Sequence, residues 1–201
     1  MIKRIVTAFA IVAAALALSM TAQAQNKKAG MNSRLYDLVQ AAREGGAKVS
    51  PAIAEQVRAD FADVDVDAVE NIITPAITGA WNCNIATSDT GLPPFKALQT
   101  FGSDGTFVET SDLLGMGGEG PAHGAYERTR RGYALTFELF VFDPMTGESV
   151  GHVRVRASIR MTSSNDFNAV TAVDFIELDG TVIEDIDGGP YTGRRLHVRA
   201  V

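Results

Sequence analysis

Apolar and polar side chains alternate with a period of two in a series of short segments that begins after Pro75. The clearest segment is 150–161, in which an aliphatic row alternates with a polar row that includes Arg154, Arg156 and Arg160. Successive side chains of a β-strand point to opposite faces, and burying three unpaired guanidinium groups would be costly. We therefore expect the aliphatic row to face a core and the arginines to lie on the outer face.

Eight segments of this kind follow one another, and short runs rich in Gly, Pro, Asn and Asp separate them. The predicted strands cover residues 80–87, 95–101, 105–111, 125–130, 133–142, 149–162, 169–178 and 192–201. The separator at 187–190, Asp-Gly-Gly-Pro, is expected to form a turn before the last strand. Short sequential connections favour an antiparallel meander, and closing the meander removes its unpaired edges. The sequence thus predicts a mainly β fold, an eight-stranded antiparallel up-and-down barrel.

The region before the strands has the period of α-helices instead. A first helix is expected to end at Gly45, and a second is expected to begin at Ser50-Pro51. The inward positions are predicted to be Leu35, Leu38, Val39 and Ala42 in the first helix and Ile53, Val57 and Phe61 in the second. A third short helix is predicted near Asp65.

The chain therefore divides into a small helical arm or lid, 32–78, and a barrel domain, 79–201. One predicted strand, 133–142, is apolar on both faces, because Phe140 and Phe142 lie opposite its main aliphatic row. Because apolar side chains on an outer face are stabilised when another element buries them, we expect the N-terminal helices to lie over this strand. The same helices could instead dock a partner protein.

The first 24 residues have the three parts of a secretory signal peptide. Lys3 and Arg4 precede an apolar run from Ile5 to Leu18, and small residues end in Ala22-Gln-Ala24. The run is shorter than the roughly 20 residues that cross a bilayer, and no later segment is long and apolar enough to do so. The sequence predicts cleavage after Ala24, a flexible lead over 25–31, and a bacterial protein exported to the periplasm or the exterior.

Composition narrows the function classes further. The formal net charge is −6, so no basic surface favours nucleic acid, and removal of the signal peptide makes the chain more acidic. Cys83 is the single cysteine, which excludes an intramolecular disulfide and a Cys-rich zinc cluster. We expect Cys83 to be a buried core thiol.

Motifs for metals and cofactors are weak throughout the chain. His123, His152 and His197 lack the local spacing of metal ligands. The acidic run 63–67 lacks the Gly and Glu that a calcium loop requires further on. The Gly-rich run 115–120 formally matches a dinucleotide fingerprint but precedes a strand, where that fingerprint does not work. We expect no cofactor and no metal site.

The sequence Gly79-Ala-Trp81, at the entrance to the first strand of an eight-strand meander, resembles the Gly-x-Trp signature of lipocalins and the wider calycin group. The chain looks most like uncharacterised secreted bacterial lipocalin-like proteins. The resemblance implies that the only Trp closes the barrel base and that an Arg of the last strand covers its indole. Arg194, Arg195 and Arg199 are the candidates; Arg194 is preferred because it shares the parity of neighbouring apolar residues. The Thr-Asp-Tyr motif and the disulfide of typical lipocalins are absent.

These features favour a protein that binds or carries a small, largely apolar ligand inside the barrel. The residues expected to contact the ligand are Phe107, Leu135, Phe137, Leu139, Val155, Ile159 and Phe175. Two alternatives remain. One is a secreted, envelope-associated interaction protein that docks a partner through its helical arm, and the other is a barrel isomerase or cyclase. The enzyme needs the polar row of 150–161, or Glu138, to point inward, whereas pairing of Glu138 and Asp174 with the outer arginines would be structural.

Overall fold

The computed structural model describes residues 35–45, 49–62, 76–86, 88, 93–112 and 121–197. Several predictions fall outside these residues. They are the signal peptide over 1–24, the lead over 25–31, the third helix near Asp65 with the acidic run 63–67, and the Gly-rich run 115–120.

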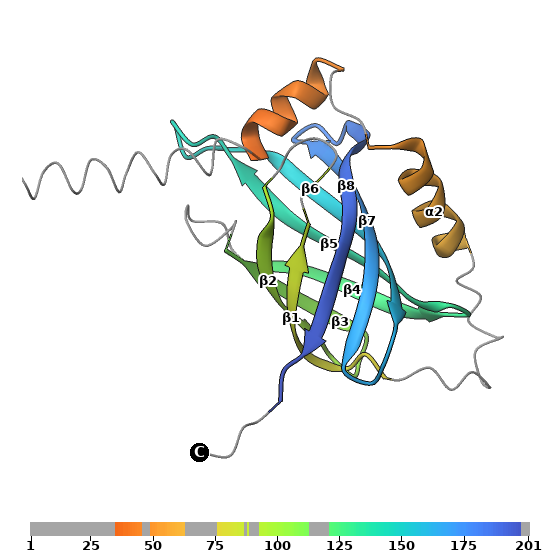
Figure 1. Ribbon diagram of the computed structural model, residues 1–201. Coiled ribbons are helices and arrows are strands. Elements are labelled where there is room, and N and C mark those ends of the chain that lie inside the picture. Colours follow the sequence, from red (N-terminus) through yellow and green to blue (C-terminus); the bar gives the residue numbers. More distant parts are fainter. Residues whose placement is uncertain are drawn as a thin grey trace, which may run out of the picture.

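The described strands form one closed antiparallel barrel in which each strand pairs with its sequence neighbours and β1 pairs with β8 (Figure 1). The strands are β1 (Gly79–Ile85), β2 (Phe95–Phe101), β3 (Thr106–Ser111), β4 (Ala122–Thr129), β5 (Gly132–Phe142), β6 (Ser149–Met161), β7 (Asp166–Glu177) and β8 (Val182–Arg195). The predicted eight-stranded up-and-down barrel is confirmed. This is an architecture consistent with a calycin-like fold.

The alternation in β6 divides inside from outside as the sequence predicts. Its aliphatic row, from Val153 to Ile159, is buried in the barrel interior. On the outer face Arg154 Nε donates to Glu138 Oε1 at 2.8 Å, and Arg156 Nη2 donates to Asp174 Oδ1 at 2.8 Å. The carboxylates in β5 and β7 therefore pair with arginines across the outside of the sheet.

The last strand begins much earlier than predicted. β8 starts at Val182, so the Asp-Gly-Gly-Pro run at 187–190 lies within a strand and the predicted turn is wrong. Gly188 allows the sheet to be approached closely, because a Cβ there would lie 2.4 Å from Thr171 O and 2.8 Å from Val49 Cγ2. The pairing register between β7 and β8 shifts between Val173 and Phe175. Gly188 and Gly189 come directly after this shift in β8. Here glycines mark a bulged strand.

Trp81 closes one end of the barrel beneath an arginine. The guanidinium carbon of Arg195 lies 4.3 Å from the centre of the Trp81 ring. The preference for Arg194 is wrong, because Arg195 is the register partner of Trp81, whereas Arg194 pairs with Asn82 and is exposed on the outer face. Gly79 is left-handed at φ 126°, and a Cβ there would lie 2.8 Å from Arg195 Nη1.

A helix over residues 35–43 lies across the opposite end of the barrel (Figure 1). Its four predicted inward residues are all buried, and Gly45 follows it with a left-handed φ of 78°, as expected at a helix end. Arg43 holds the helix to the strand ends, since its Nε donates to Glu177 Oε1 at 2.6 Å and its Nη2 donates to Val150 O at 3.3 Å.

The second helix, α2 (Pro51–Ala62), packs on the outside of β6, β7 and β8. Its buried residues are Ala54, Val57 and Asp60. Of the three residues predicted to face inward, Val57 is buried, whereas Ile53 and Phe61 are partly exposed. Asp60 accepts hydrogen bonds from Ser158 Oγ and Arg160 Nη2 of β6, which turns this polar residue toward the sheet. The expected cover over β5 is not formed by the described helices, and Phe140 is 62% exposed.

Candidate functional site

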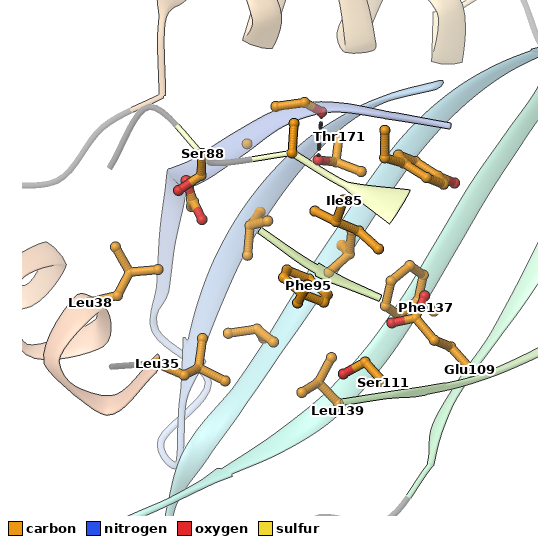
Figure 2. A pocket seen from close by; sticks show the side chains of 18 of the residues that line it. Leu35, Leu38, Ile85, Ser88, Phe95, Glu109, Ser111, Phe137, Leu139 and Thr171 are labelled. Carbon is orange, nitrogen blue, oxygen red and sulfur yellow. Dashed lines mark hydrogen bonds between the residues drawn. The ribbon is translucent and has the colours of Figure 1, made fainter. Parts of the chain in front are cut away.

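A cavity of about 100 Å³ lies inside the barrel, between the strands and the helix over residues 35–43 (Figure 2). Leu35 and Leu38 line it from the helix. Its other apolar lining side chains are Ile85, Ala86, Phe95, Phe137, Leu139, Val153, Val155, Val173 and the ring of Tyr191. An eight-stranded barrel is just wide enough either to fill with side chains or to hold one small ligand. In this chain one end is filled and the other end is hollow.

Aromatic side chains fill the end closed by Trp81. The ring centres of Trp81 and Phe167 lie 4.9 Å apart, and those of Phe101 and Phe107 lie 5.0 Å apart. All four side chains are essentially inaccessible to solvent. Phe137 packs against Phe107, with ring centres 5.0 Å apart, and links this closed-end cluster to the cavity.

The residues predicted to contact a ligand divide between these two ends. Phe137, Leu139 and Val155 line the cavity. Phe107, Leu135, Ile159 and Phe175 are buried in the packed core and do not belong to the described cavity wall. Alternation identifies which side chains point inward, but it gives no position along the barrel axis. The contact of Phe137, Leu139 and Val155 with a ligand stays a prediction.

Three polar side chains form the floor of the cavity: Gln99 of β2, Glu109 of β3 and Tyr191 of β8. Gln99 and Glu109 are register partners, and Gln99 Nε2 donates to Glu109 Oε2 at 2.6 Å. Each lies two residues from a phenylalanine of the closed-end cluster, so each occupies the next inward position along its strand. All three are at least nine-tenths buried. We call Gln99, Glu109 and Tyr191 the polar floor.

Burial dominates the electrostatics of the polar floor. It raises the pKa of Glu109 to about 7, and the hydrogen bond from Gln99 offsets only part of this effect. Burial also raises the pKa of Tyr191 well above its usual value, and the charges of Cys83 and Glu109 add to the increase. The pKa of Cys83 is raised by its burial and by Glu109. Cys83 is a free, buried thiol, as predicted. Below about pH 7 the floor therefore carries little charge.

The polar floor was not predicted, although the sequence contains a signal for it. Gln99 has the parity of Phe95 and Phe101, and Glu109 has the parity of Phe107. Leu98 and Val108 obscure this signal, because both are apolar and yet lie on the outer face, 51% and 39% exposed. If the face that carries the phenylalanines is taken as the inner face of each strand, Gln99 and Glu109 are predicted to lie inside the barrel.

The polar row of β6 and Glu138 lie outside the barrel, contrary to what the enzyme alternative required of them. His152 Nε2 lies 3.3 Å from Glu138 Oε2 on the outer face, and His123 and His197 are exposed. Within the described residues, no group of three or more His, Cys, Asp and Glu side chains is arranged to hold a metal ion. None of the described helices is long and apolar enough to cross a membrane.

Comparisons with protein-family models, with curated proteins and with solved structures find no match for this chain. The assignment of a function consequently depends on the barrel, its cavity and the chemistry of the lining residues.

Proposed function

We propose that this protein binds a small, largely apolar molecule in the cavity beneath the helix over residues 35–43. The observation that carries the proposal is a hollow barrel end walled mainly by aliphatic and aromatic side chains, next to a closed end that is tightly packed. Native cores leave few voids larger than a water molecule. A void of this kind that is confined to one end, with a few convergent polar groups, is typical of a binding site.

The size of the cavity limits the ligand. At about 100 Å³ it is smaller than an engineered cavity of about 150 Å³ that binds benzene, and far below the roughly 300–1,000 Å³ of drug-sized sites. A single ring or a short aliphatic chain fits this volume. A larger ligand would require the helix over residues 35–43 to move outward.

The two helices act here as parts of the barrel. Leu35 and Leu38 form one wall of the cavity, and α2 places Val57 and Asp60 against the sheet. Because both apolar faces are already buried, a lid is favoured over an arm that docks a partner. We also propose export to the periplasm or the exterior, on the strength of the signal-like sequence at 1–24.

The substitution Val155→Phe tests the site, because it places a ring in the cavity at a position that lines it. Toluene and phenol, titrated calorimetrically, should each bind the full-length mature chain saturably at one site. Val155→Phe should weaken the binding of both probes by about tenfold or more, because the new ring occupies the ligand's volume. A tenfold loss of affinity corresponds to about 1.4 kcal/mol.

The control is Val108→Phe, which makes the same change on the outer face of β3. It should leave both affinities unchanged. Absence of saturable binding by either probe, or binding that survives Val155→Phe intact, would contradict the proposal.

A further inference from the structure

The polar floor contains two buried atoms without a hydrogen-bond partner. They are Gln99 Oε1 and the Tyr191 hydroxyl. Gln99 is 2% exposed and Tyr191 is 4% exposed, and both side chains line the cavity. A buried polar group that lacks a partner costs about 1–3 kcal/mol, and such groups in native proteins call for an explanation.

The hydrogen bond between Gln99 and Glu109 fixes which atom of the amide faces the cavity. Gln99 Nε2 donates to Glu109 Oε2, so the amide oxygen is the atom left over. This oxygen can only accept a hydrogen bond, whereas the Tyr191 hydroxyl can both donate and accept. Gln99 and Tyr191 are near enough for the amide to influence the pKa of the phenol. One small ligand group can therefore meet both.

We propose that the polar floor recognises the hydroxyl group of the ligand, and that the ligand is a small alcohol or phenol with an apolar body. The ligand O–H donates to Gln99 Oε1, and its oxygen accepts from the Tyr191 hydroxyl. This inference rests on the proposed function, because it assumes that the cavity is the binding site.

Other polar groups fit less well. A carbonyl accepts from Tyr191 but leaves Gln99 Oε1 unpaired, and a carboxylate would bring its charge close to the oxygens of Gln99 and Glu109. At the polar floor an ammonium would need an ionised Glu109 as a partner, and burial disfavours the charged form of that carboxyl. The groups that face Glu109 from neighbouring strands are Gln99, Cys83 and Tyr191, and none of them is cationic.

Phenol and toluene, which have nearly the same shape, separate the hydroxyl from the apolar body. In a wholly apolar cavity toluene would bind better, because the hydroxyl of phenol would lose its hydrogen bonds to water. We expect the reverse for the wild-type chain at pH 6, with phenol bound about tenfold more tightly than toluene. Both affinities are measured by calorimetry on the full-length mature chain.

Tyr191→Phe and Gln99→Met each remove one partner of the hydroxyl while preserving the size of the side chain. Each should reduce the preference for phenol to less than about threefold, mainly through weaker phenol binding. Tyr133→Phe is the matched control, because Tyr133 is also buried but its hydroxyl accepts from Ile77 N at 3.3 Å, away from the cavity. It should keep the full preference, and either cavity variant suffices if the other fails to fold.

Equal affinities of the wild type for phenol and toluene would overturn the hydroxyl assignment, because they would show that the polar floor does not distinguish a hydroxyl from a methyl group. Retention of the preference in both Tyr191→Phe and Gln99→Met would also overturn it. So would tighter binding of benzylamine than of phenol, which would indicate recognition of a cation by a carboxylate of the cavity, Glu109 or Asp187. These outcomes leave the cavity as a binding site. If neither phenol nor toluene binds at all, the proposed function itself fails.

Discussion

Replacing Glu109 by Gln should stabilise the protein at pH 8 by up to about 3 kcal/mol and change little at pH 4. Glu109 is buried in the polar floor, with Gln99 as its hydrogen-bond donor and no cationic partner among the described residues. The neutral amide of Gln keeps the shape of the side chain and an oxygen that can accept from Gln99. It removes only the cost of ionising the buried carboxyl.

The direction of the pH dependence follows from the pKa of Glu109, which rises from an ordinary 4.5 to about 7 on folding. Between these two values the native chain holds a proton that the unfolded chain releases. The native state thus binds more protons, and the free energy of unfolding falls as pH rises. The stability linked to this group is fully present below the unfolded pKa, and it is lost by the time pH exceeds about 7.

Urea denaturation of both chains between pH 4 and 9 measures this effect. The difference in the free energy of unfolding between Glu109→Gln and wild type should grow from near zero at low pH and level off above pH 7. Glu127→Gln, at an exposed position of β4, serves as the control and should show no such growth. A difference for Glu109→Gln that stays constant over the whole range would contradict the buried, shifted carboxyl.

Replacing Arg195 by Ala should cost about 2–3 kcal/mol of stability, whereas the same change at Arg194 should cost less than about 0.5 kcal/mol. Arg195 fastens the closed end of the barrel. Its Nη1 and Nη2 donate to Thr78 O and Ala76 O at 2.6 and 2.5 Å, and its Nε donates to Ser164 O at 2.8 Å. Its guanidinium group also lies over the Trp81 ring.

Urea denaturation monitored by the fluorescence of Trp81, the only tryptophan, reports directly on this end of the barrel. Arg195→Lys should recover only part of the loss, because an ammonium cannot donate from a planar fork to two separate carbonyls. Arg194 is the natural control, being adjacent in β8 and exposed. Equal losses for the alanine variants at 194 and 195 would show that the closed end does not depend on this contact.

Strand number and inward parity were predictable because they follow from local alternation. Seven of the strands begin within a few residues of the predicted positions, and β2 has the predicted bounds. β8 was the exception, since Gly188, Gly189 and Pro190 are turn residues in most contexts. In this chain they are tolerated because the strand is bulged and the Val49 segment and Thr171 approach it closely.

The candidate site was only partly predictable. Phe137, Leu139 and Val155 were expected to contact a ligand, and they line the cavity, but the polar floor was missed. Gln99 and Glu109 come from strands with apolar residues on both faces, so alternation alone does not show which face of each strand is buried. Cover for the outer Phe140 was expected from the helices, yet Asp60 fixes α2 on β6 instead.

Local patterns in the chain were enough to predict the eight-stranded meander, the position of Trp81 at the entrance to the first strand, and the faces of the sheet on which the arginines and aliphatic residues lie. These are properties of neighbouring residues, because alternation and turns act within a few positions of the chain. Three features could be established only from the folded barrel: which end is packed and which is hollow, that Arg195 rather than Arg194 lies over Trp81, and that Gln99, Glu109 and Tyr191 line the same cavity. Those features depend on pairing register and on depth along the barrel axis, which bring together residues from β2, β3 and β8 that the chain separates widely.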